Sequence, residues 1–66
     1  MPIVQIQILQ GRSEQQIKSL IDDVTNATVK NLQVHPRQVR VIVTEIPSTH
    51  WGIEGRTMKD INEQNT

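Results

Sequence analysis

The sequence predicts an α/β (α+β) fold, a single βαβ unit with a short C-terminal hairpin that assembles into an oligomer. Three observations predict it: alternating apolar residues at 3–9, an amphipathic helical stretch, and a second β-branched run at 39–46. A strand, a helical crossover of about 20 residues and another strand form a βαβ unit, whose strands run parallel. At 66 residues the chain makes one domain, residues 1–66.

The first strand is predicted over residues 3–9, which read IVQIQIL. Val4, Ile6 and Ile8 fall on one face and glutamines on the other, which is the period-two alternation of a strand. The strand ends at Gly11, and a helix begins near Ser13, because Ser13 and Gln16 have the spacing of a capping box.

The helix is predicted to end before His35-Pro36, because the residue preceding proline avoids the α region. Its apolar residues recur at helical spacing and form one stripe: Ile17, Leu20, Ile21, Val24, Ala27, Thr28 and Leu32. The second strand follows over residues 39–46. Gly52 and Gly55 bracket the predicted hairpin, and residues 59–66 are expected to form a polar, frayed tail.

Self-association is predicted because so short a chain buries a marginal core. With no cysteine, disulfides cannot compensate. One sheet face is covered by the helix, and the other carries further apolar residues: Ile3, Leu9, Ile42 and Ile46. A two-stranded sheet is also unstable alone and has two open edges.

Composition excludes several partners. Seven basic and seven acidic side chains cancel, which argues against nucleic-acid binding. No apolar run is long enough to span a membrane, and the start lacks the features of a signal peptide, so we expect a cytoplasmic protein. His35 and His50 have no metal-ligand spacing, and no cofactor motif is present, so neither a metal nor another cofactor is predicted.

Pro2 is the candidate catalytic residue. A proline here can simply open a strand where no N–H is needed. If Met1 is removed, which we expect because residue 2 is small, Pro2 presents a secondary amine able to accept a proton. Burial and nearby cations both oppose protonation of such an amine, which favours a base at neutral pH.

Two arginines and one tryptophan are the candidate substrate-binding residues. Arg12 follows the first strand, where an arginine is as often merely solvated. Arg40 lies within VRVIV, so it either snorkels at a sheet edge or has an anionic partner. Two guanidiniums suit a dicarboxylate. Trp51 is the single aromatic residue, and such a residue is more often a core or interface anchor than an active-site wall.

In combination, four segments resemble the 4-oxalocrotonate tautomerase family over roughly residues 1–58. They are Met1-Pro2-Ile3-Val4-Gln5-Ile6, Leu9-Gln10-Gly11-Arg12-Ser13, Val39-Arg40-Val41-Ile42-Val43-Thr44-Glu45 and His50-Trp51-Gly52-Ile53. The resemblance implies a βαβ subunit with a C-terminal hairpin. Subunits would pair into four-stranded sheets, and three pairs would form a homohexamer.

The resemblance also implies the chemistry. Pro2 would shuttle a proton in an enol–keto isomerisation without metal or organic cofactor. Arg12 would bind one substrate carboxylate, and Arg40 would bind the other and polarise the adjacent 2-oxygen. Trp51 falls on an apolar wall position that is usually phenylalanine, and Glu54 stands where glycine is frequent, so the natural substrate is open.

Three functions follow from these residues. The first is an isomerase acting on 2-hydroxydienoates such as 2-hydroxymuconate. The second is a hydrolytic dehalogenase of haloacrylates on the same fold, which would need an acidic residue that we cannot place. The third is a non-catalytic oligomeric module that binds small anions through Arg12 and Arg40.

Overall fold

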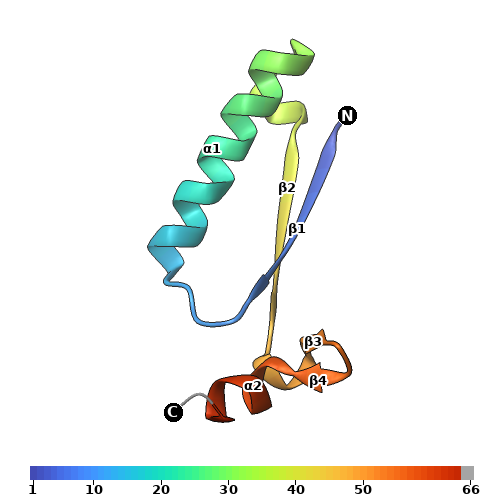
Figure 1. Ribbon diagram of the computed structural model, residues 1–66. Coiled ribbons are helices and arrows are strands. Elements are labelled where there is room, and N and C mark those ends of the chain that lie inside the picture. Colours follow the sequence, from blue (N-terminus) through green and yellow to red (C-terminus); the bar gives the residue numbers. More distant parts are fainter. Residues whose placement is uncertain (65–66) are drawn as a thin grey trace.

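A parallel two-stranded sheet and one helix form the body of the molecule. In the computed structural model, which describes residues 1–64, strands β1 (Ile3–Leu9) and β2 (Arg40–Ile46) pair in parallel from Ile3↔Arg40 to Leu9↔Ile46. Helix α1 (Glu14–Leu32) connects them and covers one face of the sheet (Figure 1). The predicted βαβ unit is confirmed.

Helix α1 begins and ends at predicted signals. The Ser13 N–H donates to Gln16 Oε1 (3.0 Å) and the Gln16 N–H donates to Ser13 Oγ (3.1 Å), so the predicted capping box is present. After Leu32, Gln33 adopts a left-handed conformation (φ 54°), and its N–H donates to the Val29 carbonyl (2.9 Å). The helix therefore ends at Leu32, with two residues between it and His35.

The core lies between α1 and the sheet, and it is thin. Among the described residues only Val39 is buried, at 8% exposure, and the other apolar side chains of this interface are half-buried. Five of the seven predicted stripe residues are half-buried, namely Ile17, Leu20, Ile21, Val24 and Thr28. Ala27 and Leu32 are exposed, Leu32 by 58%. Leu32 lies in the last turn of α1, beyond the start of β2 (Figure 1), so the sheet offers nothing for it to pack against.

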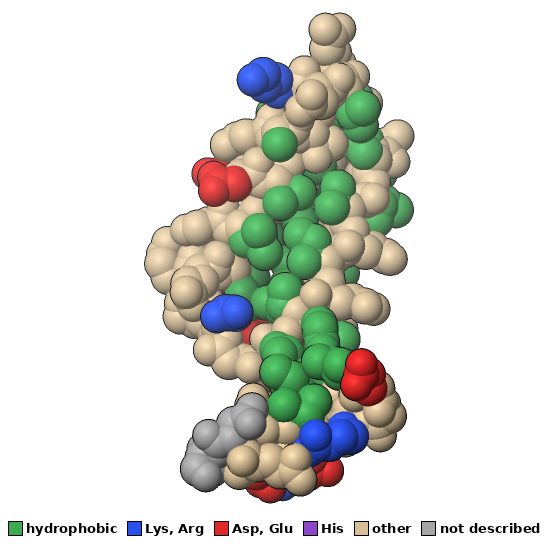
Figure 2. Space-filling view, viewed as in Figure 1, with side chains coloured by type: hydrophobic (Ala, Val, Ile, Leu, Met, Phe, Trp, Pro, Cys, Tyr) green, Lys and Arg blue, Asp and Glu red, His purple; other side chains and the backbone are tan. Residues whose placement is uncertain are grey.

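The sheet face opposite α1 is open, as predicted. On this face Ile3 of β1 is 61% exposed, and Ile42 of β2, which pairs with Gln5, is 48% exposed. In the view of Figure 2, by contrast, most of the visible hydrophobic side chains gather between α1 and the strands and continue toward the C-terminal residues. Leu9 and Ile46, at the far end of the open face, are half-buried. Exposed β-branched side chains on an unpaired sheet favour association with another surface.

A 3₁₀ turn, η1 (Pro36–Gln38), joins α1 to β2. We predicted that the second strand begins at Val39, but it begins one residue later. The reason is that the Val39 N–H donates to the Pro36 carbonyl (3.1 Å) and so closes the turn instead of joining the sheet.

The C-terminal arm, residues 47–64, contains a turn, a hairpin and a helix: η2 (Ser48–His50), β3 (Gly52–Ile53), β4 (Arg56–Thr57) and α2 (Met58–Gln64). The hairpin was predicted, and its two turn residues, Glu54 (φ 52°) and Gly55 (φ 83°), both have positive φ. Two-residue hairpins need this geometry, which explains why glycine is favoured where this chain has Glu54.

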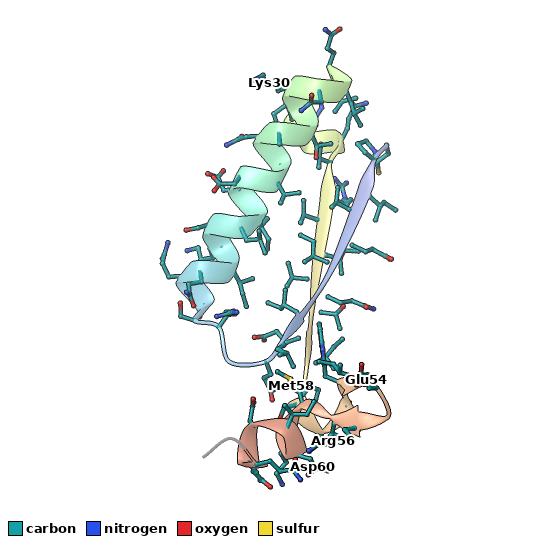
Figure 3. All side chains as sticks on the ribbon, in the orientation of Figure 1. Lys30, Glu54, Arg56, Met58 and Asp60 are labelled. Carbon is teal, nitrogen blue, oxygen red and sulfur yellow. The ribbon has the colours of Figure 1, made fainter. Side chains whose placement is uncertain are left out.

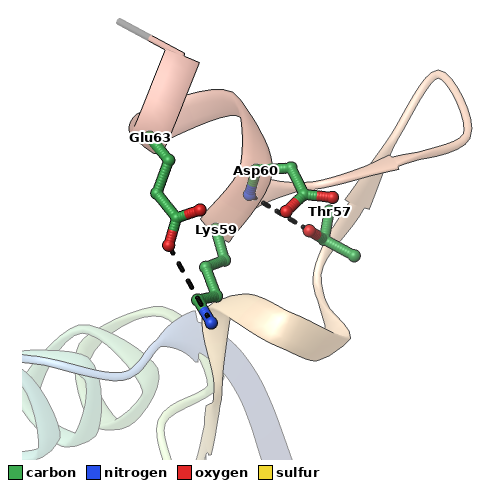
Figure 4. Close-up of polar contacts among 4 residues, drawn as sticks. All are labelled: Thr57, Lys59, Asp60 and Glu63. Carbon is green, nitrogen blue, oxygen red and sulfur yellow. Dashed lines mark hydrogen bonds and ion pairs between the residues drawn. The ribbon is translucent and has the colours of Figure 1, made fainter. Parts of the chain in front are cut away.

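The prediction of a frayed polar tail from Lys59 is wrong for residues 59–64, which form most of α2, while residues 65–66 lie outside the described part. The Asp60 N–H donates to Thr57 Oγ1 (3.2 Å), and Lys59 pairs with Glu63 (3.9 Å) (Figure 4). Thr57-Met58-Lys59-Asp60 matches the Ser/Thr-x-x-Asp/Glu start signal of a helix, which we did not use.

The arm projects from the carboxyl end of β2, away from the βαβ body (Figure 1). The molecule measures 46 × 24 × 14 Å, and its radius of gyration is 15.5 Å. A compact chain of this length would have a radius of about 11 Å. The elongation therefore leaves the arm with little contact to the rest of its own chain. None of the described helices is long and apolar enough to cross a membrane.

Candidate active site

Pro2 and Arg40 lie side by side at the amino end of the sheet. The Arg40 N–H donates to the Pro2 carbonyl (3.0 Å), which is part of the first pair of the parallel register, Ile3↔Arg40. Pro2 is half-buried, whereas Met1 is 79% exposed. With Met1 attached, the Pro2 nitrogen is an amide. Removal of Met1 would leave a secondary amine at the position where β1 begins.

The Arg40 side chain is exposed on the open face of the sheet. Its Nη1 donates to the Arg37 carbonyl (2.6 Å) and more weakly to the Val39 carbonyl (3.4 Å). Of the two arrangements that the sequence allowed for this arginine, the structure has the exposed one. Within the described residues no carboxylate pairs with Arg40, so its charge is available to an anionic ligand.

Arg12 lies at the opposite end of the same strand. It is exposed and stands between Gly11 (φ 127°) and the helix cap Ser13. The seven residues of β1 separate it from Pro2, and a strand of that length spans about 20 Å. The structure therefore does not bring the two predicted arginines together within one chain.

Trp51 also lies at the Arg12 end, because it follows the carboxyl end of β2 and parallel strands end at the same edge. It is half-buried between η2 and the hairpin, and its carbonyl accepts the Met58 N–H (2.7 Å). Within one chain Trp51 thus belongs to the C-terminal arm, in keeping with the commoner role of a lone tryptophan. Figure 3 labels residues toward the two ends of the molecule, with Lys30 of α1 near one end and Glu54 and Arg56 of the hairpin near the other.

The candidate site residues therefore form two groups. The Pro2 group, Pro2 and Arg40, lies at the amino ends of the strands. The Arg12 group, Arg12 and Trp51, lies beyond their carboxyl ends. Residues 1–64 enclose no pocket, and among them no cluster of three histidine or acidic side chains is placed to hold a metal. Neither group is a complete site on its own.

Sequence reasoning missed the surroundings of Arg40. His35 and Pro36 were used only as the stop signal of α1. In the structure they begin η1, the turn whose Arg37 carbonyl accepts from the Arg40 guanidinium. The signal was present, since a proline at the first position of a turn and a glutamine three residues after His35 are features of a capped start.

The chain is similar to known tautomerases. The family model described as "Tautomerase enzyme" matches residues 2–61. The 2-hydroxymuconate tautomerase of Stutzerimonas stutzeri is 48% identical over 61 residues, which cover 92% of this chain and 97% of that protein. The protein of the same name from Pseudomonas putida is 44% identical over 62 residues, covering 94% of this chain and 98% of that protein.

The chain belongs to the tautomerase family. It is therefore an enzyme of the isomerase class. Solved structures agree: the TomN homologue of 4-oxalocrotonate tautomerase, from the tomaymycin biosynthetic pathway, superposes with a TM-score of 0.93 at 31% identity, over 98% of this chain and 100% of that one. A heterohexameric 4-oxalocrotonate tautomerase from Chloroflexus aurantiacus J-10-fl gives 0.86 at 33% identity, over 92% and 98%. This tautomerase thus has the βαβ fold with a C-terminal hairpin found in an oligomeric relative.

Proposed function

We propose that this tautomerase catalyses enol–keto isomerisation of 2-hydroxydienoates such as 2-hydroxymuconate, with the amino group of Pro2 as the general base. The observation that carries the proposal is that Pro2 lies next to Arg40, whose guanidinium has no carboxylate partner in residues 1–64. Two relatives named 2-hydroxymuconate tautomerase support the substrate class.

The proposed reaction moves one proton. The Pro2 amine takes the proton from the 2-hydroxyl group, electron density shifts along the conjugated chain, and the protonated amine returns the proton to a distant carbon. Arg40 would hold one carboxylate and the adjacent 2-oxygen, where negative charge develops. Arg12 would hold the second carboxylate, and Trp51 would line the apolar wall.

Such a site has to be shared between copies of the chain. Arg12 and Pro2 lie at opposite ends of a strand about 20 Å long, farther apart than one small dicarboxylate reaches. A second copy could place its Arg12 group against the first copy's Pro2 group. The open sheet face, the two sheet edges and the projecting arm are surfaces through which copies can associate. We therefore propose a homo-oligomer, a hexamer by analogy with the hexameric relative.

The test is a ketonisation assay on protein whose mass shows that Met1 has been removed. Loss of the dienol absorbance of 2-hydroxymuconate, faster than in buffer and proportional to enzyme concentration, is the expected result. A processed, folded oligomer that accelerates neither this enol nor a monocarboxylic analogue would refute the proposed function.

A further inference from the structure

The turn that precedes β2 is closed on itself by side chains. The Arg37 N–H donates to His35 Nδ1 (3.2 Å), and the His35 N–H donates to Gln38 Oε1 (3.0 Å). Two backbone bonds close the same turn, from Gln38 N–H to the His35 carbonyl (2.9 Å) and from Val39 N–H to the Pro36 carbonyl (3.1 Å). Pro36 also fixes its own φ. Four hydrogen bonds therefore define the path of these residues.

Within this turn, the carbonyl oxygen of Arg37 accepts a hydrogen bond from the Arg40 side chain. The Arg37 carbonyl accepts from Arg40 Nη1 at 2.6 Å, the shorter of the two bonds that this guanidinium makes. That carbonyl belongs to the Arg37–Gln38 peptide, whose N–H donates to the His35 carbonyl, and the preceding Pro36–Arg37 peptide is held by its N–H bond to His35 Nδ1. The buried Val39 anchors the turn to the body. The position of the guanidinium is thus set by residues that lie earlier in the chain.

The bond to the turn also leaves the Nε–Nη2 edge of the Arg40 guanidinium available for a ligand. A guanidinium has five N–H donors, and Nη1 alone is engaged by the turn. Nε and Nη2 can still bind a carboxylate with two parallel hydrogen bonds. An arginine held in advance loses less side-chain freedom when the ligand arrives than a freely rotating one does.

We propose that His35 is a positioning residue for Arg40: by capping the turn, it holds the Arg40 guanidinium ready for a substrate carboxylate. Gln38 contributes from the other side of the same turn. This inference rests on the proposed function, because it takes Arg40 to be the group that binds a carboxylate. It adds a residue, His35, that need not touch the substrate.

Three variants separate positioning from stability. His35→Ala removes the acceptor of the Arg37 N–H. His35→Asn keeps an acceptor on the corresponding δ atom, and asparagine is among the best capping residues. Asn31→Ala is the matched control, since it removes an exposed side chain-to-backbone hydrogen bond, Nδ2 to the Ala27 carbonyl (2.7 Å), from the last turn of α1. Sedimentation checks that each variant keeps the assembly of the wild type.

The readout is calorimetric binding of hexanedioate, an unreactive six-carbon dicarboxylate, with hexanoate as the monocarboxylate reference. His35→Ala should weaken hexanedioate binding by about 2- to 10-fold, the range for one lost hydrogen bond. His35→Asn and Asn31→Ala should stay within about twofold of the wild type. In an Arg40→Ala background, His35→Ala should cause no further loss, because the two residues act through one interaction.

Three results would overturn the inference; the first two concern His35→Ala and the third the wild type. The first is a His35→Ala variant that binds hexanedioate as the wild type does. The second is a His35→Ala change that loses as much affinity in the Arg40→Ala background. The third is a wild type that binds no hexanedioate, since Arg40 would then not be a carboxylate site. Failure of the proposed function has a different signature: hexanedioate binds and responds to His35→Ala, but the wild type accelerates no enol.

Discussion

The two ends of the sheet hold their arginines in different ways. At the amino end, the Arg40 guanidinium is bound to a closed turn, and its backbone is paired with Pro2. At the carboxyl end, Arg12 is exposed next to Gly11, with no hydrogen bond or ion pair among the described residues. The Pro2 group is therefore organised within a single chain, whereas in the proposed shared site Arg12 would gain its partners from another copy. Chemistry that depends on both is linked to assembly.

The largest effect should come from blocking the Pro2 nitrogen. A cleavable extension in front of Pro2 keeps that nitrogen an amide, so it cannot accept a proton. We expect kcat/KM for the enol to fall by about 10²- to 10⁴-fold, the usual contribution of a general base. Steady-state kinetics, with the intact mass measured on the same sample, checks this.

The matched control is the same sample after a protease has removed the extension and left Pro2 as the first residue. Activity should return to the wild-type value. Pro2→Ala should lie between the two, because it leaves a less rigid primary amine. Full activity in the extended protein would exclude Pro2 as the base, whatever the assembly.

The next effect should come from the arginines. Arg12→Ala and Arg40→Ala should each lower kcat/KM for a dicarboxylic enol by about 10- to 100-fold, since a charged hydrogen bond is lost. The loss should be smaller with a monocarboxylic enol. Arg40→Ala should lower kcat more than Arg12→Ala does, because the 2-oxygen beside Arg40 becomes more negative in the transition state.

Mixing variants tests whether the site is shared. Arg12→Ala subunits still supply an intact Pro2, and subunits with a blocked Pro2 still supply Arg12. If each site takes Pro2 from one copy and Arg12 from another, co-refolding the two weakly active proteins should produce some complete sites. Activity above that of either parent supports the shared site. A mixture no more active than its parents, in oligomers shown by mass to be mixed, would place Arg12 and Pro2 of one chain in separate functions.

A smaller effect concerns the open face of the sheet. In an isolated chain Ile42 is 48% exposed, so replacing it should matter little for folding. If the face is an interface, Ile42→Asp removes an apolar contact worth about 1 kcal/mol, since only the exposed half of Ile42 remains to be buried there, and it introduces a charge. Sedimentation equilibrium at micromolar concentration should then show smaller species. Asn26→Asp, which places the same charge on the exposed side of α1, should leave the assembly intact.

The sequence was informative where periodicity and capping agree. Alternation at Val4, Ile6 and Ile8 and the box at Ser13 predicted the strand and the start of α1 correctly. The separation of Arg12 from Pro2 could also have been predicted. The two residues lie before and after one strand, and the rise per residue of a strand is known. What the sequence could not show is which carbonyl the Arg40 guanidinium would reach, since that depends on the fold of a turn three residues away.

Helix α2, at the end of the C-terminal arm, is the other element that the sequence did not predict, and the reason is energetic. Helix α2 has seven residues, too few to be stable from helical propensity alone. Its half-buried side chains, Met58 and Ile61, give it a small apolar contact, and a polar cap completes it. Average composition therefore made the segment look like a tail, although the Thr57 hydroxyl, the Lys59–Glu63 pair and two half-buried apolar residues all support the helix.

The smallest expected effect compares this cap with the cap of α1. Thr57→Ala removes the hydroxyl that accepts the Asp60 N–H, and Ser13→Ala removes the corresponding acceptor for Gln16. Each change should cost about 1 kcal/mol, the usual value of an N-cap.

The cost should appear in different places, because α1 belongs to the βαβ body and α2 to an arm with few contacts to it. Ser13→Ala should lower the global unfolding temperature. Thr57→Ala should instead speed hydrogen exchange in residues 58–64 while leaving exchange in β1 and β2 unchanged. Thr57→Ser, which keeps the hydroxyl, should restore wild-type exchange. Equal acceleration throughout the sheet in Thr57→Ala would contradict this prediction, because it would show that the arm and the body unfold as one unit.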